Sequence, residues 1–91
     1  MTIISERSLA PDPQALALSA LGWVLADSHR AERLLALTGL TPDALRDGLG
    51  DRAVLGAVLD FLAGNEADLL AAAGALQVEP EAIPAAREKL A

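Results

Sequence analysis

The chain lacks cysteine and tyrosine, and it has one tryptophan, one phenylalanine and one histidine among its 91 residues. Without cysteine there are no disulfides, no thiolate catalysis and no Cys-ligated zinc, and nothing indicates an oxidising compartment. His29 is the only histidine, so no other residue could supply the imidazole base of a hydrolytic triad. Its neighbour Ser28 points in a different direction on a helix, so the two do not form a nucleophile–base pair. We therefore expect a non-catalytic protein with no cofactor.

Basic residues are also scarce. Seven Lys and Arg stand against thirteen Asp and Glu, which gives a net charge of −6 and an isoelectric point near 4.5. An acidic surface repels the phosphates of nucleic acids and anionic lipids. Nucleic acid and membrane surfaces are therefore expected to be poor partners.

The chain has no long hydrophobic segment. The uncharged run ALALSALGWVLA, residues 15–26, is well short of the roughly 20 residues that cross a bilayer. The residues before it contain Glu6 and Asp12 against Arg7, so the positive region of a signal peptide is absent. We expect a cytoplasmic protein without a membrane span.

Alanine and leucine are abundant. The sequence is 53% hydrophobic, with few aromatic and β-branched residues, and this composition favours helices. The length fits one domain. We predict an all-α fold, a compact bundle of about six helices, with residues 1–10 as a flexible N-terminal arm and residues 11–91 as a single helical domain.

Capping residues mark the helix boundaries. Helices are predicted over 13–26, 28–38, 42–47, 52–63 and 66–76, each preceded by a residue that can accept hydrogen bonds from the first turn: Asp12, Asp27, Thr41, Asp51 and Asn65. Asp68 occupies the acid position of a capping box. Pro80 opens a sixth helix, and Pro84 is expected to distort or delay it.

Apolar spacing indicates which faces are buried. Leu18, Leu21 and Leu25 form one stripe on the first helix, extended by Leu16 and Trp23. The helix over 52–63 is apolar around most of its circumference, which is typical of a helix at the centre of a core.

A shift of 38 residues superimposes the two halves of the chain. Trp23 then coincides with Phe61, and the cap Asp27 with Asn65. Because capping residues match as well as alanine and leucine, we predict two tandem three-helix units related by an internal repeat, with Trp23 and Phe61 at equivalent core positions.

The stretch LTGLTPDALRD, residues 37–47, has the outline of a helix-turn-helix. The small residue that usually allows the two helices to cross is replaced by Leu35, and the second helix offers Asp43, Arg46 and Asp47. A recognition helix needs cations for phosphates and side chains for base edges. A helix-turn-helix-like nucleic-acid-binding regulator is therefore the alternative function, and a helical corner is the structural interpretation that we prefer.

A few charged residues stand out. His29, Arg30 and Arg33 form the only local basic patch and could receive an acidic partner, although such clusters are usually solvated. Asp43 and Asp47 lack the pattern of a calcium loop. Asp60 interrupts the apolar VLDFL segment, and we expect it to face water, because an unpaired Asp is rarely buried.

The segments ALALSALGWVLAD, LLALTGLTPDALRD and AVLDFLAGNEADLLAAA together resemble a family of short helical bacterial proteins known as a domain of unknown function. The resemblance covers residues 14–90. It implies a bacterial origin and a cytoplasmic location, and it carries no activity and no site residues.

The expected function is a small protein-interaction or adaptor module that binds a protein partner or a second copy of itself. The high apolar content should leave an exposed patch, and the uncharged outer face of the first helix is the favoured place, with Leu16 or Leu18 partly exposed. The candidate interaction surface consists of Leu16, Leu18, His29, Arg30, Arg33 and Asp60.

Overall fold

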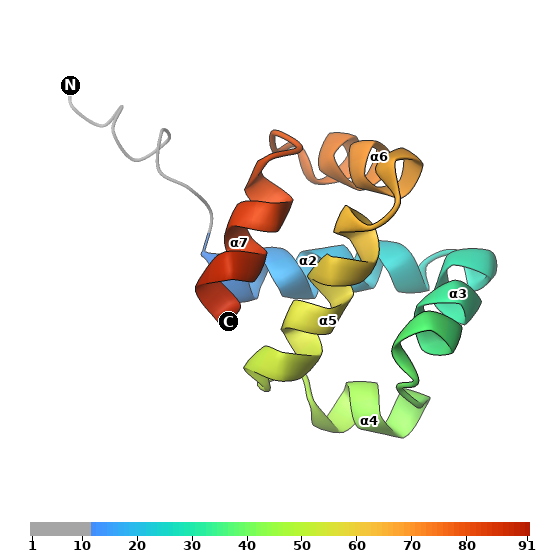
Figure 1. Cartoon of the computed structure of the whole chain (residues 1–91). Helices are drawn as coiled ribbons and strands as arrows, with labels where there is room; N and C mark the ends of the chain where they lie inside the picture. The colour runs from blue at the N-terminus through green and yellow to red at the C-terminus, as the bar shows by residue number, and fades with distance from the viewer. Residues whose placement is uncertain (1–11) are drawn as a thin grey trace.

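The computed structural model describes residues 12–91 as six helices with no strand (Figure 1). The helices are α2 (Pro13–Leu25), α3 (Ser28–Thr38), α4 (Pro42–Asp47), α5 (Arg52–Ala63), α6 (Glu66–Leu76) and α7 (Ala82–Leu90). The predicted all-α fold of about six helices is confirmed. The predicted N-terminal arm, residues 1–10, lies outside the described residues.

Side-chain caps start five of the helices where the sequence predicts them. Asp12, Asp27, Thr41, Asp51 and Asn65 each accept a hydrogen bond from a backbone N–H in the following first turn, at 2.8–3.1 Å. These N–H groups have no partner within the helix, so each cap satisfies a donor that would otherwise depend on water.

Two helices end in the left-handed conformation. Gly39 follows α3 with φ of +76° and Gln77 follows α6 with φ of +60°. Glycine adopts this conformation without cost, whereas a residue with a Cβ is strained there. Gln77 is held in it by hydrogen bonds from its own N–H to Gly74 O and from the N–H of Val78 to Ala73 O.

Helix α5 occupies the centre of the core, as its apolar sequence predicts. It packs against α2, α3, α6 and α7, and Figure 1 shows it crossing α2 with α7 on one side and α3 on the other. Its buried residues are Leu55, Gly56, Val58, Leu59, Phe61 and Leu62. Helices α2, α3, α6 and α7 complete the core by packing against it, and α4 contributes Leu45.

The predicted stripe on α2 is wrong in part. Leu21 is buried, but Leu18 and Leu25 are 41% and 48% exposed. The face that packs on α5 and α7 consists instead of Leu16, Ala17, Ala20, Leu21 and Val24. Alanine at two of these positions gives the packed face short side chains, while the longer Leu18 and Leu25 lie at the surface.

Trp23 and Phe61 differ in burial. Phe61 is 7% exposed and belongs to the core, whereas Trp23 is half-buried at its edge. The prediction of equivalent core positions is therefore correct for Phe61 and wrong for Trp23. The indole ring lies under the Arg30 guanidinium, 3.7 Å from the ring centroid, so a cation covers part of its surface.

The internal repeat remains a prediction. Under the 38-residue shift, α3 coincides with α6, and the left-handed residues Gly39 and Gln77 also coincide. The last helices differ, because α4 has six residues at the periphery while α7 has nine and packs against α5 and α2.

The last helix begins at Ala82, two residues later than Pro80 would place it. Pro84 lacks an N–H and therefore has to lie in the first turn, where no intrahelical donor is needed. The delay that the sequence predicts for this helix is confirmed. Residues 80 and 81 form a turn instead, with hydrogen bonds from Ala82 N to Glu79 O and from Ile83 N to Pro80 O.

None of the helices within residues 12–91 has both the length and the hydropathy needed to cross a membrane.

Loss of a cap should destabilise the domain measurably. We expect Asp27→Ala and Asn65→Ala each to lower the free energy of unfolding by about 1 kcal/mol, because each leaves a first-turn N–H without its acceptor. Urea melts followed by circular dichroism measure this change. Asn65→Asp keeps an acceptor and serves as the control. Unchanged midpoints in both alanine variants would contradict the assigned boundaries.

Shortening a buried side chain of the central helix should lower the free energy of unfolding more than loss of a cap does. We expect Phe61→Ala to lower the free energy of unfolding by about 3–5 kcal/mol, since it removes a buried ring and leaves a cavity. Phe61→Leu, which keeps most of the apolar volume, should be milder in the same urea melts. Equal midpoints for the alanine variant and the natural chain would show that this position is not part of the packed core.

Candidate functional site

The six candidate surface residues do not form one site. Leu16 is 5% exposed and packs in the core, so its assignment to an interaction surface is wrong. It lies on the face of α2 that α5 and α7 cover. Leu18 is exposed on the other face of α2, as the outer-face prediction allows, and His29 is exposed in the first turn of α3.

Arg30 folds back over α2. Its Nη2 donates a hydrogen bond of 2.6 Å to the carbonyl of Trp23, and its guanidinium stacks on the Trp23 ring. Its Nε is buried without a hydrogen-bond partner. Arg30 therefore fastens the corner between α2 and α3 and offers little of its charge to a binding partner.

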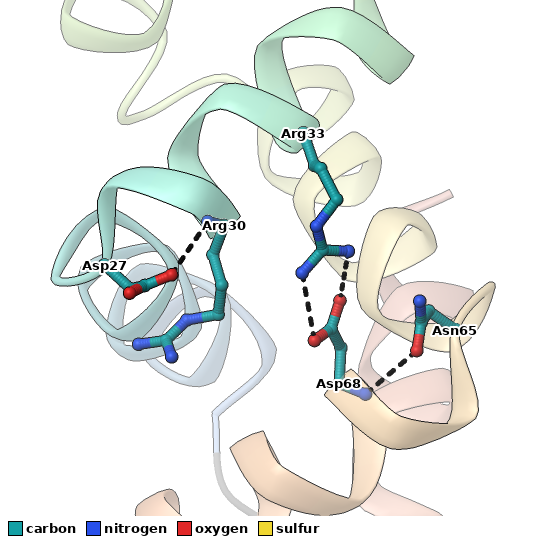
Figure 2. A network of polar contacts seen from close by, with 5 residues as sticks. All are labelled: Asp27, Arg30, Arg33, Asn65 and Asp68. Carbon is teal, nitrogen blue, oxygen red and sulfur yellow. Dashed lines mark hydrogen bonds and ion pairs between the residues drawn. The ribbon is translucent and has the colours of Figure 1, made fainter.

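Arg33 binds Asp68 with two hydrogen bonds, which tie α3 to α6 (Figure 2). Nη1 donates to Oδ2 at 2.7 Å and Nη2 donates to Oδ1 at 3.2 Å. The hydrogen bonds to Asp68 raise the pKa of the Arg33 guanidinium above its usual range, against a smaller opposing effect of burial, and the charges of Asp68 and Asp27 raise it further. A raised pKa means that this arginine contributes fully at any pH below its ordinary value and loses its effect only in strong alkali.

The capping box predicted for α6 is half formed. Asn65 Oδ1 accepts from the N–H of Asp68 at 3.1 Å, but the Asp68 carboxylate turns to Arg33 instead of to the backbone of Asn65 (Figure 2). A guanidinium gives a carboxylate two charge-assisted hydrogen bonds, which outweigh one bond to a neutral amide. The sequence does not show that Arg33 stands opposite Asp68, because the two are 35 residues apart.

Asp60 is exposed, as predicted, and it has a cationic partner. Its Oδ1 lies 2.9 Å from Nε of Arg87, and the two side chains form an ion pair between α5 and α7. Gly56, one turn earlier, is buried under this arginine. A Cβ at Gly56 would stand 3.2 Å from Arg87 Nη1, so the glycine makes room for the side chain.

Arg33 and Asp60 line one pocket of about 460 Å³ between α3 and α5, together with Leu37, Phe61 and four smaller residues. The guanidinium is already held by Asp68, and the carboxylate by Arg87. The pocket therefore brings two candidate residues together, but each of them is already paired with an oppositely charged residue of the same chain.

A second concavity, of about 470 Å³, is almost entirely apolar and lies between α2, α3 and α4. We call it the leucine groove. Leu25 and Leu49 stand at its surface, 48% and 43% exposed, so the groove is open to solvent. Its lining consists of Leu21, Leu25, Ala31, Leu35, Pro42, Leu45, Arg46 and Leu49.

Sequence analysis missed the leucine groove. One signal was available in Leu49, which stands between Gly48 and Gly50 in a turn where a polar residue is usual. The rest of the lining depends on how α4 is placed relative to α2 and α3, and local spacing does not determine that arrangement.

The arginines of residues 12–91 all have a partner within the same chain. Arg30, Arg33 and Arg87 have the partners described above. Arg46 pairs with Asp43 at 2.8 Å, and Arg52 Nη2 donates to the carbonyl of Lys89 at 2.6 Å. No group of three or more metal-ligating side chains gathers anywhere in this part of the chain.

The Arg33–Asp68 pair should act as a unit. We expect Arg33→Gln and Asp68→Asn each to lower the urea midpoint, and the double variant to lower it by less than the sum, because either change alone removes both hydrogen bonds. Asp43 and Arg46 supply the control, since their side chains are 80% and 70% exposed and such pairs contribute little. Strictly additive midpoints at Arg33 and Asp68 would contradict a coupled pair.

The chain was compared with known proteins. No curated protein and no solved structure matches it. A family model described as "Protein of unknown function (DUF3572)" matches residues 10–91, which is nearly the whole chain. The chain therefore belongs to the DUF3572 family.

Proposed function

We propose that this protein is a non-catalytic protein-interaction module and that its partner binds in the leucine groove. The observation that carries the proposal is the exposure of Leu25 and Leu49 at the edge of a concave, apolar surface. Isolated leucines on a surface are ordinary, but leucines gathered around one concavity provide the dry centre that protein interfaces need.

The composition of the chain supports this proposal. Its hydrophobic content of 53% is high for 91 residues, and a domain of this size buries only about 60–65% of the surface of its unfolded chain. Some apolar area therefore remains outside the core. The groove continues onto the outer face of α2 through Leu25, and Leu18 stands seven residues earlier on that uncharged face.

The use of the arginines favours a protein partner over nucleic acid. DNA-binding proteins gain affinity by presenting cations to phosphates and releasing counterions. In residues 12–91 the five arginines bind carboxylates, carbonyls or an aromatic ring of the same chain. The helix after the Gly39 turn, α4, carries Asp43 and Asp47 against Arg46, so a recognition helix there would be acidic.

A charge placed in the groove should abolish association. We expect Leu49→Glu to eliminate binding of the native protein to its partner, because the carboxylate would have to be desolvated against apolar side chains. Leu25→Glu should do the same. The measurement is capture of partners from native lysate by the tagged full chain, with sedimentation of the purified protein to detect self-association.

Leu70→Glu is the matched control. Leu70 is 51% exposed on α6, outside the groove, and its substitution adds the same charge to a site of similar exposure. Circular dichroism melts of all three variants confirm that they are folded. A monomeric protein without a partner would overturn the proposal. Salt-sensitive retardation of random duplex DNA in a gel, or equal effects of Leu49→Glu and Leu70→Glu, would also overturn it.

A further inference from the structure

We infer that the leucine groove receives an amphipathic helix of a different protein, with leucine-type side chains on its inner face and Lys or Arg along its flanks. This inference rests on the proposed function and adds the chemistry of the partner. The observations that support the inference are the shape and lining of the groove and the sign of the charges beside it.

The groove suits a helix better than other peptide conformations. Extended peptides bind by adding a strand to a sheet edge, and residues 12–91 contain no strand. Proline-rich peptides need grooves lined with aromatic rings, but neither Trp23 nor Phe61 lines this one. Acidic and phosphorylated motifs need clusters of arginines, and Arg46 is the only arginine of this lining. A helix with apolar anchors is the recognition mode that remains.

The charges beside the groove are mainly negative. On α4, Pro42, Leu45 and Arg46 line the groove, and the exposed Asp43 and Asp47 lie along the same short helix. On α3, the exposed Glu32 follows Ala31 and precedes Leu35 by one turn, which places it at the margin of the lining face. Asp51 follows Leu49 by two residues.

Two arginines, Arg46 and Arg52, stand beside the aspartates of this group along the chain. Asp43 pairs with Arg46, while Glu32 and Asp47 make no ion pair with another described residue. A partner with Lys or Arg beside its apolar face would meet several uncompensated negative charges.

The basic residues of α3 do not cancel this charge. Helical spacing places Arg30 and Arg33 on one face of α3, whereas Ala31 and Leu35 lie on the face that lines the groove. The contacts of the two arginines agree with this arrangement. Arg30 lies over Trp23, Arg33 points to Asp68 of α6 (Figure 2), and none of these residues lines the groove.

A second copy of this chain is a poor occupant. Each copy carries a net charge of −6, so two copies would bring like charges together beside the groove. The arginines that could compensate are engaged within each copy. Charge therefore favours a basic partner over self-association.

Two designed peptides test the inference. Each is an alanine-rich helix of about 18 residues, because shorter isolated helices are marginal in water. Leucines stand at positions i, i+3, i+4 and i+7, and the flanks carry lysine in one peptide and glutamate in the other. Titration calorimetry against the full chain should show the lysine peptide binding at least about tenfold more tightly. The advantage should shrink between low salt and about 0.15 M salt, where screening is strong.

The groove variants separate specific binding from general attraction. Leu49→Glu makes the protein more acidic, so nonspecific attraction to the lysine peptide would increase, whereas binding in the groove should fall by at least about tenfold. Leu70→Glu adds the same charge outside the groove and should not weaken binding. Binding that is unchanged or tighter in Leu49→Glu would overturn the inference. Equal affinity for the two peptides would overturn it as well.

The inference and the proposed function can fail separately. If neither peptide binds while Leu49→Glu still releases the native partner, the groove is an interface and the basic helix is wrong. If sedimentation shows self-association that Leu49→Glu abolishes, the occupant is a second copy and the inference is again wrong. If native association ignores the groove variants, the proposed function itself fails.

Discussion

Enclosure of α5 by four other helices is the constraint on which the rest of this small fold depends. Six of its twelve residues are buried, and α2, α3, α6 and α7 all pack against it. A helix that is apolar around most of its circumference has to be enclosed, and a chain of 91 residues has few helices with which to do this. Four neighbours are therefore used to cover α5. The short α4 lies at the periphery, where it contributes Leu45 to the core and forms one wall of the leucine groove.

The arginines serve the same enclosure. Arg33 ties α3 to α6 through Asp68, Arg87 ties α7 to α5 through Asp60, and Arg30 fastens the corner between α2 and α3. Thirteen Asp and Glu stand against seven Lys and Arg, so carboxylates remain in excess after these ion pairs form.

Local signals in the sequence predict the helices well and their packing poorly. The caps Asp27 and Asn65 fix where α3 and α6 begin, and the all-apolar segment predicts the central position of α5, since these features depend on neighbours along the chain. The errors are tertiary. Leu16 is buried and Leu18 is exposed because the alanines of α2 set which face meets α5. Asp68 leaves its capping role for an arginine 35 residues away. The groove combines leucines from three helices, and spacing within one helix does not predict such a combination.

The stacking of Arg30 on Trp23 has a spectroscopic consequence. Trp23 is the only tryptophan and the chain has no tyrosine, so near-ultraviolet emission from the protein comes almost wholly from one indole. That indole lies at the corner between α2 and α3, half-buried and 3.7 Å from a guanidinium. Its emission colour therefore depends on whether this corner is closed, while the phenylalanine of α5 remains optically silent. Emission from Trp23 thus reports opening of the corner, and circular dichroism reports loss of the helices, so the two events can be observed separately without any label.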